Sequence, residues 1–166
     1  DMNAWVSLLR SKNPQMQIGF HGVSLGAAMA LIYSASDEGK QMKFYVADSS
    51  YGDLLDLGRD KLMKYTGDDR LVLGMDVLNP FFQAALYMHT GKLLSDIDPV
   101  NRVQHMTSPV LFLHGAKDQL VPPEVAEFLL ADSSSTNIFQ GASHTMEMSA
   151  NGPAYREYVT DFIKNT

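Results

Sequence analysis

The chain has 166 residues, of which 45% are hydrophobic and 19% are charged, a composition typical of one folded globular domain. A net charge of −6 and the lack of any cluster of lysines and arginines argue against nucleic acid as a partner. The chain has no cysteine, which excludes disulfides and thiolate metal sites. The compartment therefore stays open between the cytoplasm and a membrane-anchored, outward-facing position.

The N-terminal end of the sequence begins inside a predicted element. Residues 2–10 carry apolar side chains at helical spacing, directly after the first residue, Asp1. No signal-peptide pattern is present, and no apolar run approaches the roughly 18 residues of a membrane helix. We therefore expect a chain that begins within a larger fold, lacks an N-terminal portion of it and has no membrane-spanning segment.

Strand and helix patterns alternate along the rest of the chain. Short apolar runs predict strands over residues 16–22, 42–47, 109–114 and 137–140. Amphipathic or alanine-rich patterns predict helices over residues 25–36, 51–65, 98–105, 122–131 and 154–164. A looser helical pattern over residues 68–91 is interrupted at Asn79-Pro80, and we expect a helical insertion at about 68–106 of a single domain, 1–166.

This alternation predicts an α/β fold in which helices flank a parallel sheet. The run PVLFLH at 109–114 is apolar throughout, as expected for a strand covered on both faces. In such folds, the functional side chains gather at the carboxyl ends of the strands. Candidate residues are therefore those that directly follow the predicted strands.

The sequence Gly22-Val23-Ser24-Leu25-Gly26 matches the pattern G-x-S-x-G between a predicted strand and a predicted helix. A sharp turn there presents Ser24 as a nucleophile, and we expect Gly22 and Gly26 to be small so that strand and helix can pack closely. The N–H of Leu25, at the start of the helix, is the predicted oxyanion donor.

A serine nucleophile needs a base that is oriented by a carboxylate, and two later loops supply both. Asp118 follows the strand at 109–114, and His144 follows the last predicted strand. Because parallel strands end at the same edge of a sheet, we expect both side chains to lie near Ser24, with His144 as base and Asp118 as acid. Taken singly, each of the two residues is more typical of an ordinary loop.

Several other polar residues are alternatives. Asp48 also ends a predicted strand and is the main rival for the role of the acid. His21 and His114 lie at strand ends and either line the site or satisfy backbone groups. His89 and His105 are weaker candidates for the base.

No motif for a metal, a nucleotide phosphate or a dinucleotide is present, so no metal or cofactor is predicted. The apolar stretch 75–88 either roofs an acyl pocket or packs in the core, and core packing is the simpler interpretation. Met146 and Met148, close after the candidate base, have the same two interpretations.

Three segments resemble the α/β-hydrolase superfamily, in particular the bacterial serine hydrolases known as cell-surface hydrolases and the dienelactone-hydrolase-like esterases. The segments are HGVSLGAA (21–28), PVLFLHGAKDQLVP (109–122) and GASHTMEM (141–148). The resemblance implies a serine hydrolase that cleaves a small-molecule carboxylic ester, or a related acyl bond, through an acyl-enzyme intermediate. A peptidase or a thioesterase would use the same triad.

The resemblance also implies what this chain lacks. The chain order Ser24, Asp118, His144 is that of the superfamily, and the four predicted strands would be the last four of an eight-stranded sheet. The loop that supplies a second oxyanion donor would precede the chain, and one donor is worth roughly 10²–10³ in turnover. The strand at 16–22 would have an unpaired edge, so we expect self-association, a separate N-terminal fragment, or a non-catalytic complementing role as an interaction module.

Overall fold

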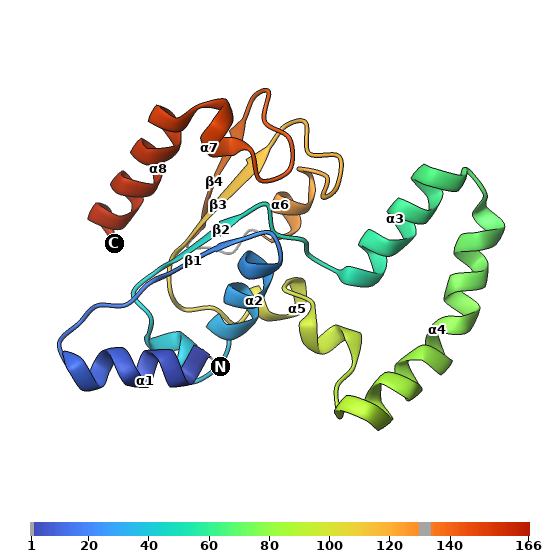
Figure 1. Ribbon diagram of the computed structural model, residues 1–166, viewed down its shortest axis with the longest axis horizontal. Coiled ribbons are helices and arrows are strands. Elements are labelled where there is room, and N and C mark those ends of the chain that lie inside the picture. Colours follow the sequence, from blue (N-terminus) through green and yellow to red (C-terminus); the bar gives the residue numbers. More distant parts are fainter. Residues whose placement is uncertain (1, 130–133) are drawn as a thin grey trace.

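Four parallel strands form the sheet in the computed structural model, which describes residues 2–129 and 134–166. In the order of the sheet they are β1 (Phe20–Val23), β2 (Tyr45–Asp48), β3 (Val110–Gly115) and β4 (Ser134–Phe139) (Figure 1). Because the strands run in one direction, their carboxyl ends lie along one edge of the sheet. The predicted parallel sheet flanked by helices is confirmed.

The helices connect the strands and continue beyond the sheet. The α-helices are α1 (Met2–Lys12), α2 (Leu25–Ser34), α3 (Leu54–Thr66), α4 (Asp69–Thr90), α5 (Val100–Val103), α6 (Val125–Phe128), α7 (Glu147–Ala150) and α8 (Gly152–Asn165). Two 3₁₀ turns, η1 (Gly39–Gln41) and η2 (Leu94–Ile97), complete the described elements.

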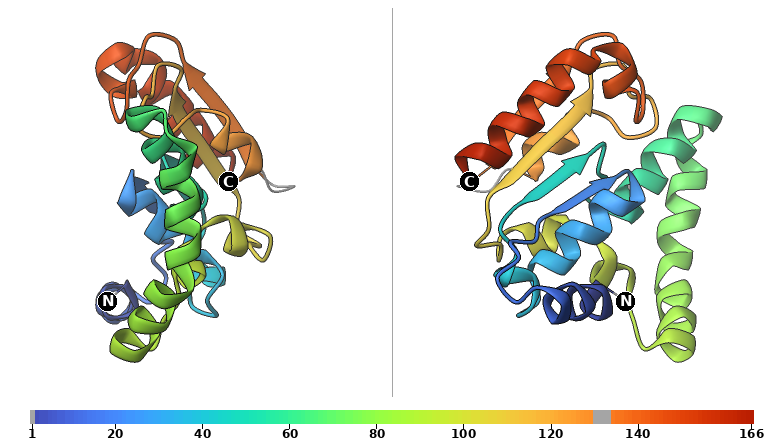
Figure 2. Two further views of the ribbon diagram at one scale, coloured as in Figure 1. Left: turned by 90° about the vertical axis from the view of Figure 1, so that its right-hand side faces the viewer. Right: turned by 60° about the vertical axis from the view of Figure 1, so that its left-hand side comes forward.

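Each face of the sheet has its own apolar core, because successive side chains of a strand point to opposite faces. On one face, Tyr45 and Phe112 pack with Leu31 of α2. On the other, Val46 and Leu113 pack with Tyr155 of α8. Figures 1 and 2 show α2 and α8 on opposite sides of the sheet. The two covered faces explain why β2 and β3 are buried along their whole length.

Several element boundaries differ from the sequence prediction by two residues or more, and those of β1, β4 and α6 differ most clearly. β1 begins at Phe20 rather than at residue 16, although the amide of Lys43 still donates to Ile18 O at 2.7 Å. β4 begins at Ser134 rather than at 137. Its first residues are polar but still pair with β3, so the apolar pattern used for the prediction did not include them. α6 covers Val125–Phe128, shorter than the predicted 122–131, of which 130 and 131 lie outside the described residues.

Helices α3 and α4 form a hairpin that projects from the sheet (Figures 1 and 2). α4 is one continuous helix of 22 residues that runs through Pro80, whereas the sequence predicted an interruption. No residue of α4 is buried. Its exposed large apolar side chains are Leu71, Leu73, Val77, Leu78, Phe81, Phe82, Tyr87 and Met88. Core packing of the stretch 75–88, the simpler interpretation of the sequence, is therefore wrong.

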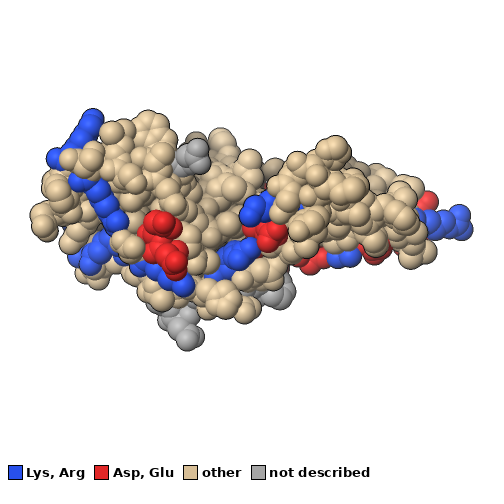
Figure 3. Space-filling view, turned by 90° about the horizontal axis from the view of Figure 1, so that it is seen from below, with Lys and Arg blue, Asp and Glu red and all other residues tan. Residues whose placement is uncertain are grey.

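By length and composition alone, α4 meets the criteria for a membrane-crossing helix, with a mean hydropathy of 1.3 over 18 residues. The sequence prediction had found no such segment. Figure 3 shows that uncharged residues form most of the lower face of the hairpin, with charged side chains mainly along one margin. The apolar character of α4 is thus a property of the molecular surface.

The remainder of the predicted insertion at 68–106 returns to the sheet. Val103 of α5 is buried in the core beside α2. Asp98, which precedes α5, is also buried, and its Oδ1 accepts a hydrogen bond from the amide of Leu54 at 2.9 Å. This contact ties the beginning of the α3–α4 hairpin to the segment that follows it.

The first turn of α2 packs closely on β1, and one glycine makes this possible. A Cβ atom at Gly22 would overlap the backbone of Gly26 and Ala27, so only glycine fits there. Gly26 differs, because a Cβ there meets no atom of the described chain within 4 Å. The steric requirement predicted for Gly26 is therefore wrong.

This contrast gives a matched pair of substitutions. Gly22→Ala should lower the free energy of unfolding by about 2 to 3 kcal/mol, because strand and helix must separate to admit the methyl group. Gly26→Ala should be neutral or stabilise by up to about 1 kcal/mol, since alanine favours helix over glycine. Urea denaturation followed by circular dichroism measures both, and equal losses in the two variants would contradict the packing described here.

Candidate active site

Ser24 lies at the turn between β1 and α2, in a backbone conformation that few residues adopt. Its φ is 53° and its ψ is −118°, and such strain costs on the order of 1–3 kcal/mol. The amide of Ser24 donates to Asp48 O at 2.8 Å, which holds the turn against the end of β2. Leu25 is the first residue of α2, so its N–H has no acceptor within the helix. The predicted strand, sharp turn and helix are all present.

The structure brings the three predicted triad side chains together at the carboxyl edge of the sheet. Ser24 Oγ lies 2.8 Å from His144 Nε2, and His144 Nδ1 lies 2.6 Å from Asp118 Oδ2. A carboxylate can only accept a hydrogen bond, so Nδ1 carries the proton and Nε2 is free to accept from the Ser24 hydroxyl. In this tautomer His144 Nε2 accepts the hydrogen bond from the Ser24 hydroxyl.

Asp118 is held rigidly from several sides, and its side chain is fully buried. Its Oδ1 accepts hydrogen bonds from the amides of Leu120 at 2.8 Å and Val121 at 2.9 Å. His114 Nε2 donates to Val121 O at 2.9 Å and also lies 3.3 Å from Asp118 Oδ2. The loop therefore presents one carboxylate oxygen to His144 and uses the other for its own structure.

The alternative candidates lie elsewhere. Asp48 Oδ2 accepts a hydrogen bond from the Tyr155 hydroxyl at 2.7 Å, and its described hydrogen bonds do not include His144. The ring of His21 contacts the same hydroxyl at 2.9 Å, and burial lowers the pKa of that ring. His89 and His105 are exposed on the surface. Of the alternatives, His114 is the one whose ring contacts a side chain of the predicted triad, the carboxylate of Asp118.

Met146 and Met148 follow His144 and are both exposed, at 46% and 54%. Core packing, one of the two interpretations of these methionines, is therefore wrong. Their side chains instead lie on the surface beside the loop of the candidate base.

A second polar cluster, which the sequence did not predict, is buried directly behind the triad. Ser49 Oγ donates to Glu147 Oε1 at 2.8 Å and also lies 3.2 Å from Asp48 Oδ1. Asp48 is 3% exposed, and Ser49 and Glu147 are 0% exposed. Glu147 stands only three residues after His144, but no sequence pattern indicates that its carboxylate points inward.

Burial dominates the electrostatics of this cluster. It raises the pKa of the Asp48 carboxyl to about 7, and charge repulsion from Glu147 acts in the same direction. Hydrogen bonds from Tyr155 and Ser49 to Asp48 act in the opposite direction. Burial, together with the neighbouring carboxyl of Asp48, raises the pKa of Tyr155, so that its phenol stays protonated and donates.

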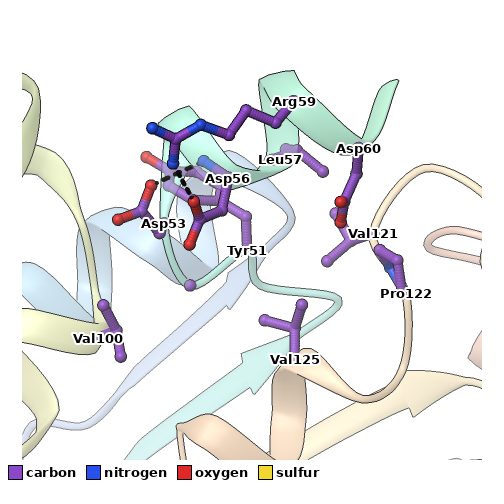
Figure 4. A pocket seen from close by; sticks show the side chains of 11 residues that line it. Tyr51, Asp53, Asp56, Leu57, Arg59, Asp60, Val100, Val121, Pro122 and Val125 are labelled. Carbon is purple, nitrogen blue, oxygen red and sulfur yellow. Dashed lines mark hydrogen bonds and ion pairs between the residues drawn. The ribbon is translucent and has the colours of Figure 1, made fainter. Parts of the chain in front are cut away.

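Two cavities adjoin the triad loops. One of about 340 Å³ is bordered by Tyr65, Lys117, Gln119, Leu120, Ser143 and His144. Another, of about 380 Å³, lies between the start of α3 and the segment that contains Val121 and Val125 (Figure 4). Figure 4 shows Arg59 on α3 pairing with Asp56 beside this second cavity. The first cavity is bordered by the imidazole itself and is therefore open to a reacting group.

Within residues 2–129 and 134–166, no three histidine, aspartate or glutamate side chains are grouped so that they could hold a metal ion. The polar side chains at the sheet edge are instead paired with one another.

Comparison with known proteins identifies the fold. No family model matches the sequence. The esterase Pf2001 of Pyrococcus furiosus superimposes with a TM-score of 0.70 at 23% identity, covering 99% of this chain and 60% of the esterase. The α/β hydrolase MGS-MChE2, from a sediment metagenome of the Mar Chica lagoon in Morocco, gives 0.63 at 17% identity, covering 98% and 68%. The chain is an α/β hydrolase by fold.

One curated relative is similar in sequence. The uncharacterized protein YqkD of Bacillus subtilis is 28% identical over 99% of this chain. The chain spans 54% of the length of YqkD and 60% of the length of the Pyrococcus esterase. The chain is thus shorter than the proteins it resembles.

The raised pKa of Asp48 predicts a pH-dependent stability. The folded chain keeps on Asp48 a proton that the unfolded chain releases near pH 3.8. The contribution of this proton to the free energy of unfolding is therefore complete below about pH 4. It is lost as the pH rises toward 7, by on the order of 4 kcal/mol. Asp48→Asn should flatten the fall in the free energy of unfolding between pH 4 and 8, measured by urea titration, and identical slopes in the two proteins would contradict the assignment.

Proposed function

We propose that the chain carries the catalytic triad of a serine hydrolase that cleaves a carboxylic ester or a related acyl bond, with Ser24 as nucleophile, His144 as base and Asp118 as acid. The observation that carries the proposal is the continuous hydrogen-bonded path from Ser24 Oγ through the His144 ring to the buried carboxylate of Asp118. The fold supports it, because the neighbours in structure include proteins named as an esterase and as an α/β hydrolase.

The chemistry follows from this path. Ser24 Oγ attacks the acyl carbon while its proton passes to His144 Nε2, and Asp118 stabilises the imidazolium that forms. His144 then protonates the leaving oxygen, which departs as an alcohol and leaves an acyl-enzyme. A water molecule gives its proton to the same nitrogen, attacks the acyl carbon and releases the acid, which restores Ser24.

The oxyanion that forms in both steps needs donors near Ser24. The Leu25 amide, at the positive end of α2, is one donor. The cavity of about 340 Å³ beside His144 would receive part of the substrate, and its lining includes Tyr65 and Leu120. A peptide or a thioester substrate would require the same three side chains, so the proposal is specific for acyl transfer rather than for one leaving group.

Covalent labelling tests the nucleophile. An excess of a fluorophosphonate probe should label the chain once, at Ser24, since the probe phosphorus is attacked by a serine that a neighbouring base activates. Ser24→Ala should abolish labelling, measured by intact mass and by in-gel fluorescence. Ser149→Ala is the matched control, because Ser149 is an exposed serine outside the lining of the cavity beside His144 and should leave labelling unchanged. Full labelling of the Ser24→Ala chain would refute the assignment.

A specific observation also favours an association role for this chain. β1 lies at the edge of the sheet, and the side chains of its last residue, Val23, and of Leu25 just beyond it are 45% and 62% exposed. Unpaired strand edges with apolar neighbours readily pair with another strand. We therefore propose that the free edge of β1 pairs with a second copy or with a separate fragment.

Light scattering tests this association. If two copies pair, the purified chain should have a mass of at least twice the 18.4 kDa of the monomer. If the partner is a separate fragment, adding that fragment should raise the measured mass above 18.4 kDa. His21→Pro should favour the monomer, because the amide of His21 points to the open edge of β1, whereas the amide of Phe20 already donates to Phe44 O within the sheet. A monomeric mass at high micromolar concentration, with turnover of a nitrophenyl ester, would count against the association.

A further inference from the structure

Two carboxyl groups are buried side by side behind the proposed triad. Asp48 ends β2, and Glu147 begins α7, three residues after His144. Ser49 Oγ lies within hydrogen-bond distance of both carboxyl groups, at 3.2 Å and 2.8 Å. The contact does not belong to the proposed triad, whose acid is Asp118. We refer to Asp48 and Glu147 as the carboxyl pair.

We propose that the carboxyl pair shares one proton and, through Ser49, holds the loop of His144 in the position where its imidazole meets Ser24. Glu147 is thus a positioning residue for the reaction. This inference rests on the proposed function only for its catalytic consequence, since the shared proton and the held loop are properties of the fold.

The count of donors and acceptors supports one shared proton. Tyr155 donates to Asp48 Oδ2, and Ser49 donates to Glu147 Oε1. Glu147 Oε2 is buried and has no hydrogen-bond partner among the described protein groups. The two carboxyl groups are neighbours, because each has an oxygen within 3.2 Å of the Ser49 hydroxyl. A proton held between the two groups satisfies the remaining oxygen and removes one of two buried negative charges.

The charged groups around the pair offer no other compensation. Among the ion pairs of the described chain, none involves Asp48 or Glu147. The titratable groups on the packed elements are Tyr155 of α8, His21 of β1 and His114 of β3. Tyr155 is a neutral donor, burial lowers the pKa of His21, and His114 is engaged by Val121 O and Asp118. Burial raises the pKa of Asp48 to about 7, in agreement with a retained proton.

Ser49 connects the pair to the loop mechanically. Its Oγ accepts a hydrogen bond from the amide of Thr145, the residue after His144, at 3.3 Å, while it donates to Glu147. Thr145 itself has a φ of 60°, a strained conformation that neighbouring contacts must maintain. Ser49 follows the fully buried β2 and donates its amide to Leu113 O at 2.9 Å. The loop of His144 is therefore hydrogen-bonded, through Ser49, to the end of the buried strand β2.

Loss of the shared proton should disturb this arrangement. Two carboxylates would then repel each other in a buried site, and the side of the loop that carries Glu147 would move away from β2. His144 would shift from Ser24, and a displacement of about 1 Å can lower a rate by about 100-fold. The rate should therefore fall at alkaline pH.

Two substitutions separate these effects. Glu147→Ala removes the hydrogen bond to Ser49 altogether. Glu147→Gln keeps an acceptor for Ser49 and offers an amide N–H to Asp48, but it cannot lose a proton. Glu157→Gln and Glu157→Ala, at an exposed position of α8, are the matched controls. All variants are measured by circular dichroism, by hydrogen exchange of peptides that cover residues 141–151, and by the rate of fluorophosphonate labelling between pH 5 and 10.

The proposal predicts distinct outcomes for the variants. Glu147→Ala should speed hydrogen exchange in 141–151 and slow labelling about 10- to 100-fold at every pH. Glu147→Gln should label within about threefold of the wild type at pH 7 and should lose the alkaline fall, because its amide stays neutral. The Glu157 variants should match the wild type in exchange and in labelling.

Other results would overturn the inference. It fails if Glu147→Ala exchanges and labels like the wild type, or if Glu147→Gln keeps the alkaline fall. If the wild type is not labelled at all, the proposed function fails instead, and exchange decides the inference. Faster exchange of 141–151 in Glu147→Ala than in the wild type, together with slower exchange in Glu147→Gln than in the wild type at pH 9, would then still support the shared proton.

Discussion

The end of β2 is the point on which the geometry of the site depends. Its last residue, Asp48, accepts the amide of Ser24 through its main-chain oxygen, and the following residue, Ser49, contacts the loop of His144 through its hydroxyl. The nucleophile and the proposed base therefore have a common anchor, although 120 residues separate them in the chain. Because β2 is paired on both sides and covered on both faces, this anchor has little freedom to move.

Backbone strain is concentrated at the same place. In the described chain, the residues other than glycine with positive φ are Ser24, Ser49 and Thr145. Ser24 belongs to the proposed triad, Thr145 directly follows His144, and Ser49 is hydrogen-bonded to the amide of Thr145. Each costs on the order of 1–3 kcal/mol and persists only where the surrounding contacts fix it. Here the contacts are the close approach of α2 at Gly22 and the hydrogen bonds of Ser49. Packing against the sheet thus maintains the positive-φ conformations of these residues, which are unfavourable in an isolated chain.

The α3–α4 hairpin differs from the sheet in how far its side chains are buried. None of the residues of either helix is buried, while each face of the sheet has its own apolar core. The hairpin joins the remainder through the amide of Leu54, which donates to Asp98, and through Lys61 and Lys64, which donate to Gln119 in the loop of Asp118. The exposed apolar side chains of α4 are not part of the core.

The sequence by itself determined the alternation of strands and helices, the turn at Ser24 and the positions of Asp118 and His144 after their strands. These features are local, because apolar periodicity and turn residues act over a few neighbours in the chain. Tertiary structure alone decided that β4 begins among serines, that α4 lies on the surface, that Gly22 and not Gly26 lacks room for a side chain, and that Glu147 turns inward to Ser49. Each of these features depends on which distant segment of the chain packs against the residue. The residues next to it in the sequence do not determine that contact.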